Sequence, residues 1–201
     1  MSNKPAVRVR ELRPTDPRVR RSVRALGDSL VALMHERAFD EITVQDILDR
    51  AGVGRATFYA HYRNKDDVLY SGYERMFAHF ELSLNAPNAK GRRLAPVEEL
   101  LTHFGDMNGF IEKLRESGKL EEIWLLGVDF VADMIERGMT PVPGTTPAVP
   151  RGLVARMLAG ALMEMMRWWL GHRGTSTPGQ MDETFHALAR MTLQRASYSL
   201  G

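Results

Sequence analysis

The chain has 201 residues, of which 44% are hydrophobic and 26% are charged, and these proportions are typical of a folded globular protein. It has no cysteine, which excludes disulfides, thiolate metal sites and thiol redox chemistry. The net charge of +2 is unevenly divided: residues 1–65 carry 13 of the 27 Lys and Arg but only 8 of the 25 Asp and Glu. This excess indicates either a basic head for a polyanionic partner or a chance cluster on a solvated face.

Helix signals dominate the chain, so the predicted fold class is all-α. Asp16-Pro17 places a capping residue before a proline, and "TVQD" and "NKDD" place caps at Thr43 and Asn64 with an acid three residues later. Thr177 is a further cap in "TPGQMDE", followed by Pro178 at the first helical position and by Gln180 three residues after the cap. Stretches rich in Gly and Pro are expected to be loops, at 85–96, 138–150 and 171–179. The predicted helices are 17–37, 44–51, 55–61, 65–84, one or two within 96–117, 119–138, 150–171 and 178–198.

No membrane segment is expected. The start of the chain lacks an apolar segment of the secretory kind, which favours a cytoplasmic location. The most apolar stretch, 152–170, is long enough to cross a bilayer. However, it contains Arg156, Glu164 and Arg167, and each such charge costs about 2.5–3.5 kcal/mol near a bilayer centre. We therefore expect this stretch to be a buried helix of a soluble protein.

The two short helices at 44–51 and 55–61 are joined by a turn at Gly52, which is the helix-turn-helix arrangement. Apolar residues of both helices can face inward, so the polar face of the second helix is left exposed. Arg55 near its start is placed to bond the edge of a guanine, and Thr57 a base edge or a thymine methyl. Tyr59 and His61 can donate to phosphates, although Tyr59 could instead pack between helices and His61 could be an ordinary surface residue.

Three residues outside the second helix extend this surface. Lys65 begins the following helix and adds a charge where the helix dipole already favours phosphate. Thr43 and Gln45 open the preceding helix and could touch the backbone or the edge of a groove. Tyr62 is as well suited to packing between helices as to a DNA contact.

Residues 39–69, "FDEITVQDILDRAGVGRATFYAHYRNKDDVL", resemble the DNA-binding region of the TetR/AcrR family of transcriptional regulators. The chain departs from the family pattern at Gly54, where a small polar cap such as Ser is usual, and at Tyr62, where Phe is usual. The residues that carry the resemblance are Thr43, Ile47, Ala51, Gly52, Val53, Thr57, Tyr59, His61, Tyr62, Lys65, Asp67 and Leu69.

The resemblance implies a three-helix helix-turn-helix DNA-binding domain at 17–77, after a basic N-terminal extension at 1–16. A C-terminal helical domain for dimerisation and effector binding is expected at 78–201. The extension is either an arm that contacts phosphate or the minor groove, or a solubilising tail. The residues implied to contact DNA are Thr43, Gln45, Arg55, Thr57, Tyr59, His61 and Lys65.

The function implied is that of a homodimeric repressor that binds a palindromic operator in double-stranded DNA and is released by a small-molecule effector. No catalytic residue, metal or cofactor is expected, and the protein is not expected to be an enzyme. The alternative is a DNA-binding assembly factor that has no small ligand and recruits or excludes a protein partner.

The predicted helix at 150–171 is apolar on two faces and so must be buried on two sides. Either a second copy of the chain covers one face, or the helix lies at the centre of its own domain. With the apolar stripe of the last helix, the first reading gives a four-helix dimer interface. Its predicted residues are Leu158, Leu162, Met165, Trp169, Phe185, Leu188 and Thr192.

Aromatic and Met residues gather on the middle helices, as in adaptable apolar pockets for a small apolar or amphipathic effector. The same stripe at helical spacing could instead be core. A break at Asn108-Gly109 is expected to interrupt the helix there. The effector-binding candidates are His103, Phe104, Met107, Phe110, Trp124, Phe130 and Met134.

Overall fold

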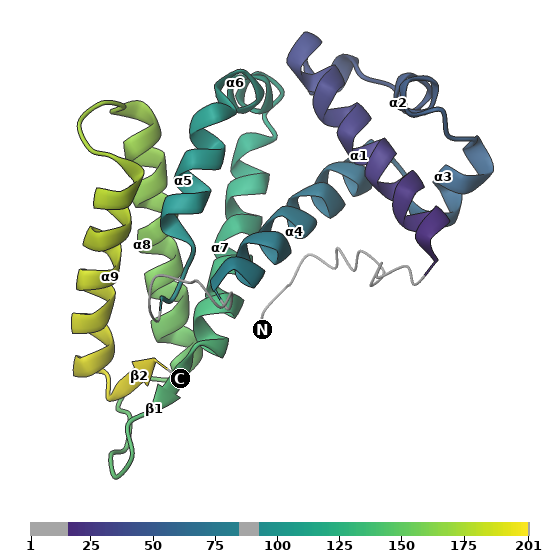
Figure 1. Ribbon diagram of the computed structural model, residues 1–201. Coiled ribbons are helices and arrows are strands. Elements are labelled where there is room, and N and C mark those ends of the chain that lie inside the picture. The colour runs from purple at the N-terminus through teal and green to yellow at the C-terminus, as the bar shows by residue number, and fades with distance from the viewer. Residues whose placement is uncertain (1–15, 85–92, 201) are drawn as a thin grey trace. The chain divides into compact units, whose positions relative to one another are not determined.

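The computed structural model describes residues 16–84 and 93–200 of the chain, so most of the expected N-terminal extension, and of the loop expected at 85–96, lies outside the described residues. Figure 1 shows a chain of helices with one small pair of strands. The elements are α1 (Pro17–Glu36), the short 3-10 helix η1 (Phe39–Glu41), α2 (Val44–Ala51), α3 (Arg55–His61), α4 (Lys65–Leu84), α5 (Val97–Asp106), α6 (Asn108–Glu116), α7 (Leu120–Arg137), β1 (Met139–Pro141), α8 (Arg151–Gly171), α9 (Pro178–Arg195) and β2 (Tyr198–Leu200).

Four helices begin directly after the capping residues that the sequence pattern predicted for them. Asp16 accepts a hydrogen bond from the backbone N–H of Arg18 at 2.8 Å. Asn64 accepts one from the N–H of Asp67 at 2.9 Å. Thr43 and Thr177 each form a reciprocal capping box with the residue three positions later. Because these local bonds satisfy N–H groups that a helix leaves open, the starts of α1, α2, α4 and α9 were predictable from short sequence signals.

The chain divides into two compact units. The first comprises the described part of Met1–Arg75 together with Gly109–Lys119, so α6 belongs with the N-terminal helices. The second comprises the described parts of Met76–Asn108 and Leu120–Gly201. The boundaries between the units fall within α4, next to the break between α5 and α6, and between α6 and α7. The break was predicted at Asn108-Gly109, but α5 ends at Asp106 and α6 begins at Asn108, so the break lies at Met107.

The core of the first unit is built from one face of each of its helices. Leu26, Leu30 and Met34 on α1 are fully buried, as are Ile47 on α2 and Phe58 on α3. On α6, the buried residues are Phe110, Ile111 and Leu114. The ring of Phe110 lies 6.2 Å from that of His35 on α1, and Lys119 pairs with Asp66 on α4 at 2.6 Å.

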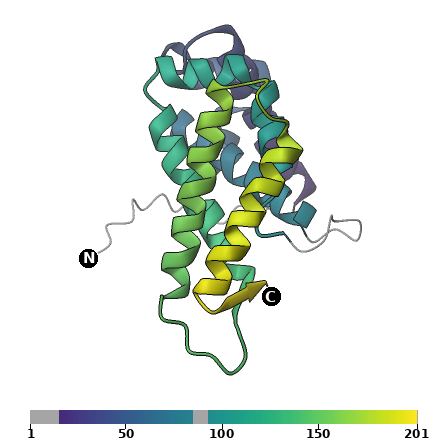
Figure 2. The same ribbon diagram turned by 90° about the vertical axis from the view of Figure 1, so that its left-hand side faces the viewer.

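The second unit is a bundle in which α7 packs along α8, and α5 packs along α9. Figure 2 shows α8 and α9 side by side. A buried polar cluster joins the start of α5 to α9: Arg93 pairs with Glu99 at 2.6 Å and with Asp182 at 3.4 Å, and His186 accepts a hydrogen bond from the N–H of Leu94. The stretch 152–170 lies in α8, and no helix of the described ranges is both long and apolar enough to span a membrane.

The all-α prediction is confirmed with one addition, a two-stranded antiparallel ribbon that pairs Met139 with Leu200 and Pro141 with Tyr198. The prediction extended the last helix to residue 198, but α9 ends at Arg195. Ser197 has a φ of 61°, outside the helical range, and turns the chain into β2. The ribbon joins segments that are far apart in sequence, so no local signal for it exists.

Candidate nucleic-acid interface

The turn between α2 and α3 has the geometry of a helix-turn-helix. Gly52 caps α2 with φ 63° and ψ 32°, a left-handed conformation that glycine adopts without strain. Ile47 and Phe58 are fully buried and anchor the two helices in the core. Gly54 precedes α3 and supplies no side-chain cap, as its departure from the family pattern implied. Because Phe58 faces inward, the opposite face of α3 is available for contact.

Two ion pairs join α2 to the end of α1, and the first of them involves the cap of α2. Thr43 Oγ1 donates to Asp46 at 2.6 Å and accepts from the Asp46 N–H at 3.2 Å. The hydroxyl and the backbone N–H of Thr43 both donate to Asp46 Oδ2, the N–H at 2.7 Å, and these two hydrogen bonds, assisted by Arg37 at 3.1 Å, lower the pKa of Asp46 to about 2. A second pair, Arg50 with Glu36 at 2.6 Å, also joins α2 to α1.

The predicted contact residues of α3 lie in three environments. Arg55 is exposed and its guanidinium bonds Gln45 on α2, whose Oε1 lies 2.6 Å from Nη2. Tyr59 is 56% exposed and meets the buried Phe58 ring edge-on at 5.2 Å. Thr57 and His61 are half-buried. The structure therefore brings Gln45, Arg55 and Tyr59 to the surface of the two helices.

The contacts of Lys65 differ from the phosphate contact that was expected for it. Its Nζ lies 2.7 Å from the carbonyl oxygen of Phe39, 2.8 Å from that of Ile42 and 3.3 Å from that of Asp40. Its charge also lies 4.5 Å from the centre of the Phe39 ring. An ammonium has three hydrogens to donate, and these carbonyls account for all three. The geometry thus favours a lysine that fixes η1 against α4 and does not support the predicted phosphate contact.

Tyr62 ends α3 and is buried, which settles the alternative left open by the sequence in favour of packing. Its hydroxyl lies 3.3 Å from Ser71 Oγ on α4, and Arg75 donates to that Ser71 oxygen at 2.6 Å. Sequence reasoning missed this group of residues. The one signal for it was Gly27 in the middle of α1, where the guanidinium of Arg75 occupies the space of a missing side chain.

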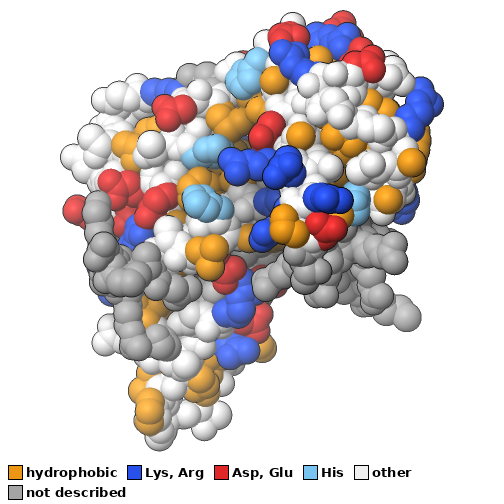
Figure 3. All heavy atoms as spheres, turned by 45° about the vertical axis from the view of Figure 1, so that its right-hand side comes forward, with side chains coloured by type: hydrophobic (Ala, Val, Ile, Leu, Met, Phe, Trp, Pro, Cys, Tyr) orange, Lys and Arg blue, Asp and Glu red, His pale blue; other side chains and the backbone are white. Residues whose placement is uncertain are grey.

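Most arginines around α2 and α3 are paired, and Figure 3 shows Lys and Arg side chains lying among Asp and Glu ones. Arg63 bonds both carboxylate oxygens of Asp67, whose pKa is held low by Arg63 against the opposing effect of burial. The exposed residues Arg18, Arg20, Arg21 and Arg24 follow the start of α1, and Arg24 lies 3.7 Å from Asp28.

Most of the predicted effector residues lie in an aromatic core of the second unit. His103 meets Phe80 at 5.4 Å and Phe104 at 5.6 Å between ring centres, and Phe130 stacks on Phe77 at 5.5 Å. Phe104, Trp124 and Met134 are buried, whereas Met107 and Phe130 are half-buried. Phe110 belongs to the first unit, and the other six candidates belong to the second.

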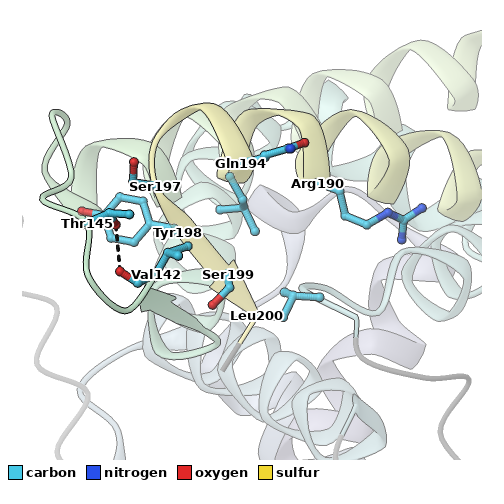
Figure 4. Close-up of a pocket in the computed structure, with 9 residues that line it drawn as sticks. Val142, Thr145, Arg190, Gln194, Ser197, Tyr198, Ser199 and Leu200 are labelled. Atoms are coloured by element: carbon cyan, nitrogen blue, oxygen red, sulfur yellow. Dashed lines mark hydrogen bonds between the residues drawn. The ribbon is translucent and has the colours of Figure 1, made fainter.

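The structure places a hollow elsewhere, between the ribbon and the end of α9 (Figure 4). Its volume is about 400 Å³, and it is open to the surface. Thr145 bonds the carbonyl of Val142 at its edge at 2.7 Å. Its lining contains none of the predicted effector residues: it consists of Val142, Thr145, Arg190, Leu193, Gln194, Ser197, Tyr198, Ser199 and Leu200.

The predicted dimer residues require a correction. Leu158, Leu162, Trp169 and Phe185 are buried within the second unit, and only Leu188 is strongly exposed. Met165 and Thr192 are half-buried. The sequence showed two apolar faces on α8, and the face assigned to the partner is the one that packs on α7 and α9. The apolar side chains that do lie on the surface of α8 and α9 are Leu153 (53% exposed), Met157 (60%), Trp168 (45%), Leu188 (59%) and Met191 (65%).

The fold and this surface define a helix-turn-helix protein with a separate helical unit. Residues 28–70, which contain α2 and α3, match the family model of bacterial regulatory proteins, tetR family. HTH-type transcriptional regulator EthR of Mycolicibacterium smegmatis is 29% identical over 126 residues, which cover 54% of this chain and 58% of EthR. The match thus spans little more than half the length of that relative. The family and this relative are transcriptional regulators, not enzymes.

Solved structures share the fold. A TetR transcriptional regulator from Streptococcus agalactiae is 23% identical with a TM-score of 0.57, over 86% of this chain and 95% of its own. The dihydroxyacetone kinase operon activator DhaS is 20% identical with a TM-score of 0.56, over 87% of this chain and 96% of its own. At these identities the likeness concerns architecture alone.

Proposed function

We propose that this protein is a homodimeric repressor that binds a palindromic operator through α2 and α3 and leaves it when a small apolar or amphipathic molecule binds. The observation that carries the DNA-binding part is the anchored α3 helix, whose buried Phe58 leaves Arg55 and Tyr59 on the surface. An exposed arginine at the start of a recognition helix suits the guanine edge in the major groove. The cytoplasm, where operator DNA is accessible, is the proposed location.

The apolar surface of α8 and α9 supports the dimer. Five large apolar side chains, each at least 45% exposed, lie on these two helices. A two-fold axis through such a surface would bury it against the same surface of a second copy. Two recognition helices would then meet half-sites one turn of DNA apart, about 34–36 Å.

Effector release is supported by the family and by the open hollow beside α9. The second candidate function, a DNA-binding assembly factor without a small ligand, is favoured by the aromatic core. The residues expected to line an effector pocket there, such as Phe104 and Trp124, instead pack against each other, with ring centres 6.5 Å apart.

The test is selection of bound sequences from a pool of random DNA duplexes by the purified full-length protein at near-physiological salt. Enrichment of a palindrome is expected, because a dimer presents the same reading surface twice. Tight, salt-sensitive binding with no enriched sequence would mean that the protein contacts phosphates without reading bases, and the operator-specific repressor would be rejected.

A further inference from the structure

Three exposed polar side chains form a hydrogen-bonded chain from α2 to α3. Gln45 Oε1 accepts from Arg55 Nη2 at 2.6 Å and from Arg55 Nε at 3.2 Å. On its other side, Gln45 Nε2 donates to Asp49 Oδ1 at 2.6 Å. Gln45 and Asp49 lie one turn apart on α2, and Arg55 opens α3. This series of hydrogen bonds therefore crosses the turn between α2 and α3 on its exposed side.

The two end residues fix the orientation of the amide between them. A guanidinium only donates hydrogen bonds, and an ionised carboxylate only accepts them. If the Gln45 amide were flipped, its NH₂ group would face Arg55 and its oxygen would face Asp49, and both contacts would be lost. Gln45 thus has a single favourable orientation, which Arg55 and Asp49 select together, and Asp49 holds the end of the amide that Arg55 does not bond.

This arrangement leaves one end of Arg55 for a ligand. Gln45 holds the edge formed by Nε and Nη2, and within the described ranges Nη1 has no protein acceptor. The end formed by Nη1 and Nη2 is the fork that bonds O6 and N7 of guanine together. Gln45 is correspondingly unsuited to read adenine, because both of its amide groups are already bonded.

We propose that Asp49 is a positioning residue for base recognition, which through Gln45 holds Arg55 in the orientation that reads a guanine in each half-site. This inference rests on the proposed DNA-binding function and names the base that Arg55 reads. An acid on a surface that meets phosphates weakens binding to every sequence. Asp49 is therefore expected to raise discrimination while lowering affinity, two effects that experiment can separate.

The experiment compares full-length wild-type protein with Arg55→Ala, Asp49→Ala and Asp49→Asn. Selection from random duplexes gives the preferred site, and dissociation constants are then measured for that site and for the same site with the guanine replaced by adenine. We expect wild-type protein to discriminate by about tenfold or more, and Arg55→Ala to lose that preference.

Comparing the two Asp49 variants separates the positioning effect of Asp49 on Gln45 from the effect of its negative charge on DNA affinity. Asp49→Ala removes the acceptor, so the guanine preference should fall several-fold while binding to unrelated duplexes tightens. Asp49→Asn removes the charge but keeps an oxygen that accepts from Gln45, so it should tighten binding to all sequences and keep the guanine preference. Thermal unfolding of each variant confirms that it is folded.

An unchanged guanine preference in Asp49→Ala, or an equal loss in both Asp49 variants, would overturn the positioning role while leaving the proposed function intact. If Arg55→Ala leaves the preference for every guanine of the selected site unchanged, the assignment of guanine to Arg55 is overturned. If wild-type protein enriches no sequence, the proposed function itself fails, and this inference falls with it.

Discussion

Arg75 shows how a single residue of α4 controls the packing beside the recognition helix. Its Nη1 donates to Ser71 Oγ at 2.6 Å, and Ser71 lies against the hydroxyl of Tyr62, which ends α3. A side chain at Gly27 would place its Cβ only 2.6 Å from Arg75 Nη2. Gly27 therefore makes room on α1 for a guanidinium that joins α1, α3 and α4.

This arrangement predicts that the effect of Gly27→Ala depends on Arg75. In the wild-type background, the displaced guanidinium loses a charged hydrogen bond of about 1.5–3 kcal/mol, which outweighs the gain of about 1 kcal/mol from replacing glycine within a helix. In an Arg75→Ala background the same substitution should stabilise by about 1 kcal/mol. Urea unfolding of the four proteins measures the difference, and a change of the same sign in both backgrounds would contradict the arrangement.

At the scale of elements, α5 contains a titratable group inside an aromatic core. Burial lowers the pKa of His103 from its ordinary value, His79 acts in the same direction, and Asp106 partly opposes them. Below the ordinary pKa of about 6.5, the unfolded chain then binds a proton more readily than the folded one. The stability of the second unit should therefore be complete above that pH and fall as the pH drops toward the lowered value.

Replacing His103 with Phe should reduce this pH dependence, because Phe keeps the ring contacts with Phe80 and Phe104 but cannot titrate. The measurement is the free energy of unfolding at about pH 7.5 and about pH 5.5 for the wild type and His103→Phe. His172→Gln, which removes an exposed imidazole, is the control. If it reduces the pH dependence as much as His103→Phe does, burial of His103 is not the cause.

At the scale of the whole molecule, the proposed dimer predicts that charge on α9 separates the subunits. Met191 is 65% exposed, so Met191→Glu should leave the fold of a subunit intact. In the proposed interface the same carboxylate would be buried against its symmetry mate, where a like charge is strongly unfavourable. We expect a monomer by sedimentation and at least a tenfold loss of operator affinity, because one recognition helix reads only half the site.

Leu125 on α7 offers a matched control, since it is 62% exposed but lies outside the proposed surface. Leu125→Glu should leave both the sedimentation coefficient and the affinity unchanged. A dimer that persists in Met191→Glu and dissociates in Leu125→Glu would move the interface away from α8 and α9.

Sequence alone determined the elements whose boundaries depend on neighbours in the chain. The helices 44–51, 55–61 and 65–84 were predicted with the bounds that the structure shows, because caps such as Thr43 and Asn64 bond the backbone three residues away. The family was likewise readable, because its signature lies within one continuous stretch, residues 39–69.

Tertiary structure decided which of several chemically similar faces is buried. Both faces of α8 are apolar, and only packing on α7 and α9 shows that Leu162 is core and that Met157 is surface. The same holds for Lys65, whose charge suggested phosphate until three distant carbonyls were placed around it. The ribbon of β1 with β2 also joins segments remote in sequence. Short-range patterns record local hydrogen bonding, whereas the partner of a face or a charge is set by chain segments that only folding brings together.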